Sequence, residues 1–195
     1  MFQNKIDLER HYRVMTDYRR NRVPGGTYFF TVNLYDRRRA LLVKNIEILR
    51  EAVRKVKINA PFHIDAWVVL PDHLHCLWTL PEGDLNFSMR WQAIKTAFSK
   101  QIPQGELRSA SRSGKAERGI WQRRFWEHTI RDDRDYAAHM DYTHFNPVKH
   151  GLVAEVADWP YSSFHHAVRM GLYPTNWAGD GVSLNDVGEA WASAR

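Results

Sequence analysis

Residues 66–81 read AWVVLPDHLHCLWTLP, and they contain the clearest structural signal in the chain. Two runs rich in β-branched and aromatic residues, 63–70 and 73–80, are separated only by Pro71-Asp72. So short a connection joins antiparallel strands, because a parallel pair needs a crossover of a dozen or more residues. The sequence therefore predicts a β-hairpin near the middle of the chain.

Side chains alternate across the second strand of this hairpin, because residues two apart share one face of a strand. One face carries His73, His75, Leu77 and Thr79, and the other carries Leu74, Cys76, Trp78 and Leu80. The wholly apolar face is expected to meet helices. The two imidazoles would then stand side by side on the uncovered face, close enough to hold one metal ion. Taken alone, the motif leaves open the alternative of two unrelated surface histidines.

The flanking sequence supplies the partners of the hairpin. Residues 28–34 predict a strand, and 125–130 predict another. Two helices are predicted, because apolar residues recur at spacings of three and four. The first helix has Ile46, Leu49, Val53 and Val56 on one face, and the second has Phe87, Trp91, Ile94 and Phe98. The resulting order, β-α-β-β-α-β, indicates an α+β ferredoxin-like sandwich, an antiparallel sheet with helices on one face.

A third helix is expected to start at a cap on Asp132 or Asp133 and to run to about Asn146, since Pro147 disfavours helical geometry before it. Tyr142 and Asn146 are four residues apart and share one face of this helix. A phenol becomes a useful nucleophile when a cation polarises its target, and an amide oxygen could complete a metal site with two histidines. A half-buried helix aromatic and a C-terminal cap are the alternatives.

Composition limits the class of protein. The 195 residues are 44% hydrophobic, which excludes wholesale disorder, and the single Cys76 excludes internal disulfides and a cysteine-based zinc site. A polar start and the lack of a long apolar run lead us to expect a cytoplasmic protein. The net charge of +6 comes with clusters of Arg and Lys interleaved with aromatics, which suit single-stranded nucleic acid, although a solvated basic surface explains them equally well.

Three regions are expected along the chain. We expect residues 1–22 to form a basic N-terminal extension, 23–153 the ferredoxin-like domain, and 154–195 an aromatic-rich tail packed on that domain. Residues 104–119 are rich in Ser, Gly and charge, and they predict a mobile loop.

Three stretches together closely resemble the REP-associated tyrosine transposases, which are single-tyrosine HUH (histidine, hydrophobic, histidine) nucleases. They are AWVVLPDHLHCLWTLP (66–81), WQRRFWEHTIRDDRDY (121–136) and DYTHFNPVKHGLV (141–153). The resemblance extends from about Tyr18 to about Asp180. It implies a metal-dependent enzyme that cleaves and rejoins single-stranded DNA at repetitive extragenic palindromes (REP), whose hairpin it recognises. Binding to such DNA would associate the protein with the nucleoid.

The same resemblance assigns roles to individual residues. His73 and His75 match the metal ligands, and Tyr142 matches the nucleophile that forms a 5′-phosphotyrosine link. Asn146 falls where related transposases have a Gln that completes the metal site. Family members use Mg2+ or Mn2+, and a site with two imidazoles favours Mn2+.

Candidate DNA-binding residues are Arg19, Arg20, Arg22 and Lys149, because their cations can hold phosphates and arginine can read guanines. A solvated tail and a charge effect at a helix C-terminus are the alternatives. A monomer is favoured. Two rival functions are a non-catalytic nucleic-acid-binding module that stacks bases on Tyr28, Phe30 and Trp67, and a metal-dependent hydrolase that uses activated water.

Overall fold

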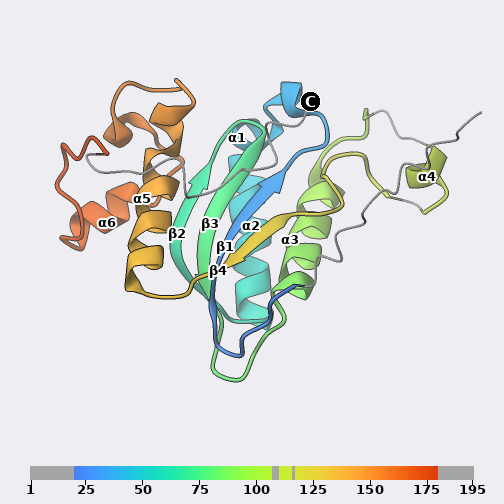
Figure 1. Ribbon diagram of the computed structural model, residues 1–195. Coiled ribbons are helices and arrows are strands. Elements are labelled where there is room, and N and C mark those ends of the chain that lie inside the picture. Colours follow the sequence, from blue (N-terminus) through green and yellow to red (C-terminus); the bar gives the residue numbers. More distant parts are fainter. Residues whose placement is uncertain (1–19, 107–109, 116, 180–195) are drawn as a thin grey trace, which may run out of the picture.

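A four-stranded antiparallel sheet forms the centre of the computed structural model, which describes residues 20–106, 110–115 and 117–179 (Figure 1). The strands are β1 (Thr27–Asn33), β2 (His63–Val69), β3 (His73–Thr79) and β4 (Trp126–Thr129). Their order in the sheet is β2-β3-β1-β4, and every neighbouring pair is antiparallel. The predicted hairpin is confirmed as β2–β3.

The two predicted amphipathic helices are present as α2 (Ile46–Asn59) and α3 (Phe87–Gln101). Two short helices, η1 (Arg37–Arg39) and α1 (Leu41–Lys44), lie between β1 and α2. Helix α2 links β1 to β2 and α3 links β3 to β4. The α+β class is confirmed, and the connectivity and strand order fit a ferredoxin-like arrangement.

The main core lies between the sheet and helices α2 and α3. Trp78 of β3 stacks on Trp91 of α3, with ring centroids 4.2 Å apart, and Cys76 is buried in the same layer, as predicted. Tyr28 and Phe30 are also fully buried here. These two side chains cannot stack on bases, so the interpretation of them as a platform for nucleic acid is wrong.

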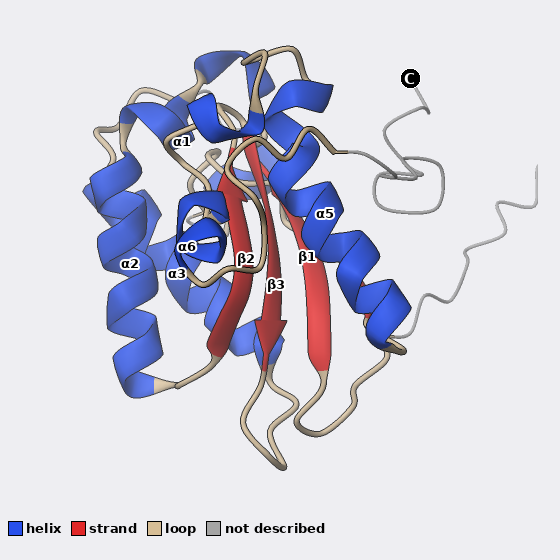
Figure 2. Ribbon diagram, turned by 90° about the vertical axis from the view of Figure 1, so that its left-hand side faces the viewer, coloured by secondary structure: helices blue, strands red, loops and turns tan. Residues whose placement is uncertain are grey.

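Helix α5 (Asp133–Lys149) covers the opposite face of the sheet (Figure 2). It packs on Phe29 and Leu77, which lie on the same face as the two histidines. Helix α5 thus covers the face of the sheet that α2 and α3 leave free, and His73 and His75 are both buried. The physical reason is that the histidine face also carries apolar side chains, whose removal from water favours a covering helix.

The start of α5 agrees with the sequence and its end does not. Asp132 caps the helix by accepting a hydrogen bond from the backbone N–H of Asp135, at 2.8 Å. The helix then continues through Pro147 to Lys149, so the predicted end at Asn146 is wrong. Proline removes one backbone donor, and the packing of α5 on the sheet outweighs that loss.

The chain after α5 covers an edge of the sheet. It forms η2 (Val156–Asp158) and α6 (Phe164–Arg169), and between them it runs beside β2. The backbone N–H of Val69 donates to the carbonyl of Tyr161, at 2.9 Å, and the N–H of Ser163 donates to the carbonyl of Trp67, at 2.8 Å. These contacts protect an otherwise exposed edge strand. No helix among the described residues is long and apolar enough to cross a membrane.

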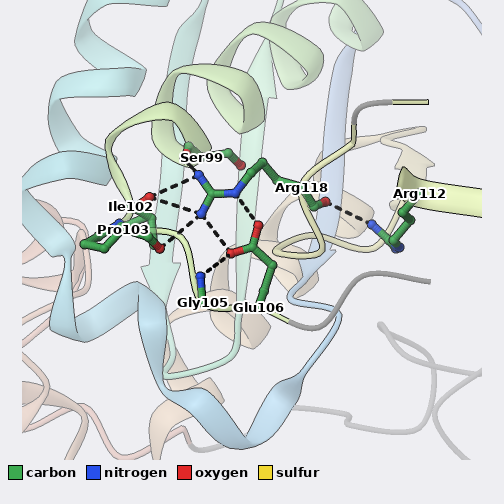
Figure 3. Close-up of polar contacts among 7 residues, drawn as sticks. All are labelled: Ser99, Ile102, Pro103, Gly105, Glu106, Arg112 and Arg118. Carbon is green, nitrogen blue, oxygen red and sulfur yellow. Dashed lines mark hydrogen bonds and ion pairs between the residues drawn. The ribbon is translucent and has the colours of Figure 1, made fainter. Parts of the chain in front are cut away.

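The insertion between α3 and β4 is organised by one arginine (Figure 3). The loop predicted over 104–119 contains one short helical turn, α4 (Ala110–Ser113). The guanidinium of Arg118 pairs with Glu106 and donates to the backbone carbonyls of Ser99, Ile102 and Pro103. It thereby ties the insertion to the C-terminal end of α3.

Candidate active site

His73 and His75 lie side by side on β3, with ring centroids 5.0 Å apart. Each ring has an oxygen atom beside its Nδ1. The Asp72 carboxylate lies 2.7 Å from Nδ1 of His73, and the Thr31 hydroxyl lies 2.9 Å from Nδ1 of His75. When Nδ1 donates to that oxygen, Nε2 carries the lone pair, which is the usual arrangement of a metal-binding histidine.

Burial and nearby charges set the ionisation of Asp72 and His75. Burial alone would raise the pKa of Asp72, but its hydrogen bond to His73 and its ion pair with Arg37 lower it to about 2. Burial lowers the pKa of His75 well below its ordinary value, and the nearby positive charge of Lys149 adds to this effect. At neutral pH the Asp72 carboxylate is therefore ionised and His75 is the neutral imidazole that can bind a metal.

Helix α5 runs over both histidines. The ring of Tyr142 lies 5.3 Å from that of His75, and the ring of His150, which caps the helix, lies 5.1 Å from that of His73. Tyr142 is fully buried. Asn146 is one turn after Tyr142 and one turn before His150, so it lies along the helix between the two points of contact.

The side chain of Asn146 is fully buried, and neither its oxygen nor its nitrogen has a hydrogen-bond partner among the described residues. A buried amide without partners is unfavourable, so its retention here calls for a ligand. Two imidazole nitrogens and one amide oxygen are suitable donors for a divalent cation. The residues of this site thus fit a metal ion.

One residue of the site was missed by sequence reasoning. Asn33 of β1 pairs with His73 of β3 and lies on the same face of the sheet. It is buried, and its Oδ1 has no hydrogen-bond partner in the described part of the chain. The sequence contained a signal for this residue, because asparagine is unusual in a β-strand. Asn33 is also two residues from Thr31, so the two side chains lie on the same face of β1.

Lys149 contacts the phenol directly. Its Nζ donates a hydrogen bond to Oη of Tyr142, at 3.0 Å, and lies 4.5 Å from the centre of the ring. Lys149 is seven residues after Tyr142, which is about two turns of an α-helix, so both residues lie on the same face of α5. This requires the helix to continue past Pro147, as it does.

The N-terminal arginines lie elsewhere. Arg20 pairs with Glu127 of β4, at 3.3 Å, and its guanidinium lies 4.4 Å from the centre of the Phe125 ring. Arg22 lies 5.9 Å from the ring of Phe87, on the α3 side of the sheet. Arg19 is outside the described residues. The structure therefore does not bring Arg20 and Arg22 together with Tyr142.

A second group of metal-ligating residues, His128, Asp135 and His139, has its ligand atoms within 4.8 Å of one another. Burial alone would raise the pKa of Asp135, but hydrogen bonds from Arg131 and His128 lower it below its usual range. The rings of His128 and His139 are stacked, 4.6 Å apart and 12° from parallel. Imidazole lone pairs lie in the ring plane, so two stacked rings do not converge on one ion. This cluster anchors the start of α5.

Comparisons with known proteins agree on one family. No family model matches the chain. It is 52% identical over 166 residues to the REP-associated tyrosine transposase of Escherichia coli (strain K12), an alignment that covers 85% of this chain and 93% of the relative. It is also similar to a solved structure of a REP-associated tyrosine transposase bound to a REP hairpin, with a TM-score of 0.77 and 51% identity. That match covers 90% of this chain and 98% of the other.

Proposed function

Because the chain belongs to the REP-associated tyrosine transposases, we propose that it cleaves and rejoins single-stranded DNA beside REP hairpins through a covalent bond to Tyr142. The observation that carries this proposal is the position of Tyr142, which contacts both the His75 ring and the ammonium of Lys149. Such a substrate would place the activity on chromosomal DNA in the cytoplasm.

The chemistry follows from the charge of the substrate. A phosphodiester is an anion and resists attack by another electron-rich oxygen. The positive side chain of Arg37 acts on this site and favours the approach of a phosphate. Attack by Oη of Tyr142 on phosphorus breaks the bond to the 3′-oxygen, and the proton lost by the phenol ends on the released 3′-hydroxyl. The reverse reaction rejoins the strand, so no nucleotide cofactor is required.

A divalent ion, Mg2+ or Mn2+, held by His73, His75 and Asn146 would neutralise negative charge on a non-bridging phosphate oxygen. Within the chain, Asp72 and Thr31 orient the two imidazoles for that role. Because Mg2+ prefers oxygen ligands, two imidazole donors should favour Mn2+. Isothermal titration should therefore give tighter binding of Mn2+ than of Mg2+, and equal affinities would contradict this coordination.

The remaining parts of the chain have supporting roles in this proposal. Residues 23–153 would form the catalytic unit, with the following segment packed along β2. Arg20 and Arg22 would contact phosphates of the hairpin stem from the α3 side of the sheet. A single chain would suffice for cleavage.

Covalency is the decisive test. The protein is incubated with Mn2+ and a hairpin substrate labelled at its 3′ end, and the products are separated on a denaturing gel. A 5′-phosphotyrosine link retains the label on the protein, whereas a 5′ label is released with the 3′-hydroxyl fragment. Tyr142→Phe should abolish the adduct and leave hairpin binding intact. Cleavage that survives Tyr142→Phe would instead support the hydrolase that uses activated water.

A further inference from the structure

The contact between Lys149 and Tyr142 requires an explanation beyond DNA binding. The ammonium lies 3.0 Å from the phenol oxygen, which is hydrogen-bond distance to the atom that would attack phosphorus. The Lys149 residue is exposed to solvent, yet its side chain reaches back over a fully buried ring. A lysine that served only to hold a distant phosphate would gain nothing from this position.

We propose that Lys149 is a catalytic residue that stabilises negative charge on Oη of Tyr142. This inference rests on the proposed role of Tyr142 as the nucleophile. In the cleavage step the phenol loses its proton as the new O–P bond forms, so the oxygen is most negative early in the attack. In the rejoining step the same oxygen is the leaving group and becomes negative again as the O–P bond breaks. One fixed cation thus assists both directions.

The chemistry of lysine defines the kind of assistance. An ammonium has three N–H donors and no acceptor, so it stabilises an anion and does not remove the phenol proton. The proton passes to solvent and the released 3′-oxygen takes one up, which keeps the reaction balanced. A donor fixed before the reaction next to a developing oxyanion typically contributes about 10²–10³ in rate. Two replacements of Lys149 are informative. Arg keeps the positive charge, whereas Met keeps only the approximate length of the side chain.

The first experiment separates catalysis from binding. Single-turnover formation of the covalent adduct is measured at saturating hairpin DNA and Mn2+, and hairpin affinity is measured separately by fluorescence anisotropy. We expect Lys149→Met to slow adduct formation about 10²–10³-fold with unchanged affinity, and Lys149→Arg to restore most of the rate. Lys55→Met, which removes an exposed cation from α2 across the sheet, is the matched control and should keep the normal rate.

A wild-type rate for Lys149→Met would overturn the proposal. So would a defect that follows weaker DNA binding and disappears at saturation, because Lys149 would then be a phosphate contact. Tyr142→Phe separates these results from a failure of the proposed function. If Tyr142→Phe still cleaves, the nucleophile is wrong, whereas loss of cleavage in Tyr142→Phe with normal cleavage in Lys149→Met contradicts only the role of the lysine.

A second experiment identifies the oxygen on which Lys149 acts. A substrate with sulfur in place of the bridging 3′-oxygen has a leaving group that needs no help from a cation or a proton donor. If Lys149 serves the phenol, the defect of Lys149→Met persists with this substrate. If the defect vanishes, the lysine serves the leaving 3′-oxygen and the proposal is wrong. A lysine needed only for folding would be revealed by a lower melting temperature and by failure of Lys149→Arg to restore the rate.

Discussion

Arg118→Met should strongly destabilise the segment between α3 and β4. The guanidinium is one-fifth exposed and makes hydrogen bonds to the carbonyls of Ser99, at 2.7 Å, Ile102, at 3.0 and 3.1 Å, and Pro103, at 3.1 Å, besides its ion pair with Glu106 (Figure 3). Removing one partner of a fully buried ion pair costs about 3–5 kcal/mol. Because Arg118 is partly solvated, we expect a loss of about 2–4 kcal/mol in the free energy of unfolding.

The matched control lies in the same insertion. Arg123 pairs with Glu117 at 2.7 Å, but the two side chains are 45% and 35% exposed. Arg123→Met should therefore destabilise the protein far less than Arg118→Met, as is usual for a surface pair. Urea unfolding of the full chain, followed by circular dichroism at pH 7, measures both variants. Equal losses for Arg118→Met and Arg123→Met would refute the conclusion that Arg118 organises the insertion.

The pH dependence of the same variant has a definite sign. The hydrogen bonds from Arg118 lower the pKa of Glu106 to about 2, against 4.5 for an ordinary glutamate. Between these values the unfolded chain binds more protons than the folded one, so the stabilisation by this pair is complete above pH 4.5 and declines as the pH falls toward 2. The difference in unfolding free energy between wild type and Arg118→Met should therefore be smaller at pH 3 than at pH 7. A difference that grows on acidification would contradict the ion pair.

Three further predictions concern the metal site. Asp72→Ala should weaken Mn2+ binding about 10–100-fold in isothermal titration, because the carboxylate orients His73, and an unchanged affinity would remove Asp72 from the site. His128→Ala should leave Mn2+ affinity unchanged but lower the free energy of unfolding by about 1–2 kcal/mol, since it breaks a hydrogen bond to Asp135; a loss of Mn2+ binding would move the metal to that cluster. Asn33→Leu should maintain or raise the melting temperature, because it removes a buried carbonyl with no partner in the described chain, while it lowers the rate of cleavage; an unchanged rate would exclude Asn33 from the site.

The sheet and its two faces could be predicted from the sequence because the alternation of side chains along a strand depends only on neighbouring residues. The short Pro71-Asp72 connection specified an antiparallel hairpin, and alternation then placed His73 with His75 and opposite the apolar core. Alternation does not say what lies above a face. That the histidines are buried depends on α5, which begins more than 50 residues later in the chain.

The insertion and the position of Lys149 were not predictable from local patterns. The segment between α3 and β4 has no apolar periodicity from which its structure could be predicted. It is held instead by Arg118, which binds backbone carbonyls, and because every residue has a backbone carbonyl these contacts leave no signal in the sequence. The end of α5 was misjudged because the rule for the residue before a proline describes a local preference. Packing of α5 over β2 and β3 outweighs that preference and keeps Asn146 helical.

The continuation of α5 past Pro147 has a consequence for the whole site. Tyr142, Asn146, Lys149 and His150 occupy successive positions along one side of the helix, and three of them have counterparts on β3 or on each other: Tyr142 with His75, Lys149 with Tyr142, and His150 with His73. Had the helix ended at Asn146, Lys149 would lie on a connecting segment with no fixed position relative to the phenol. A helix packed rigidly on the strand holds all these groups at constant separations, which is the condition for a preorganised reaction centre. The proline that suggested an end to the helix thus lies inside the segment that positions the cation.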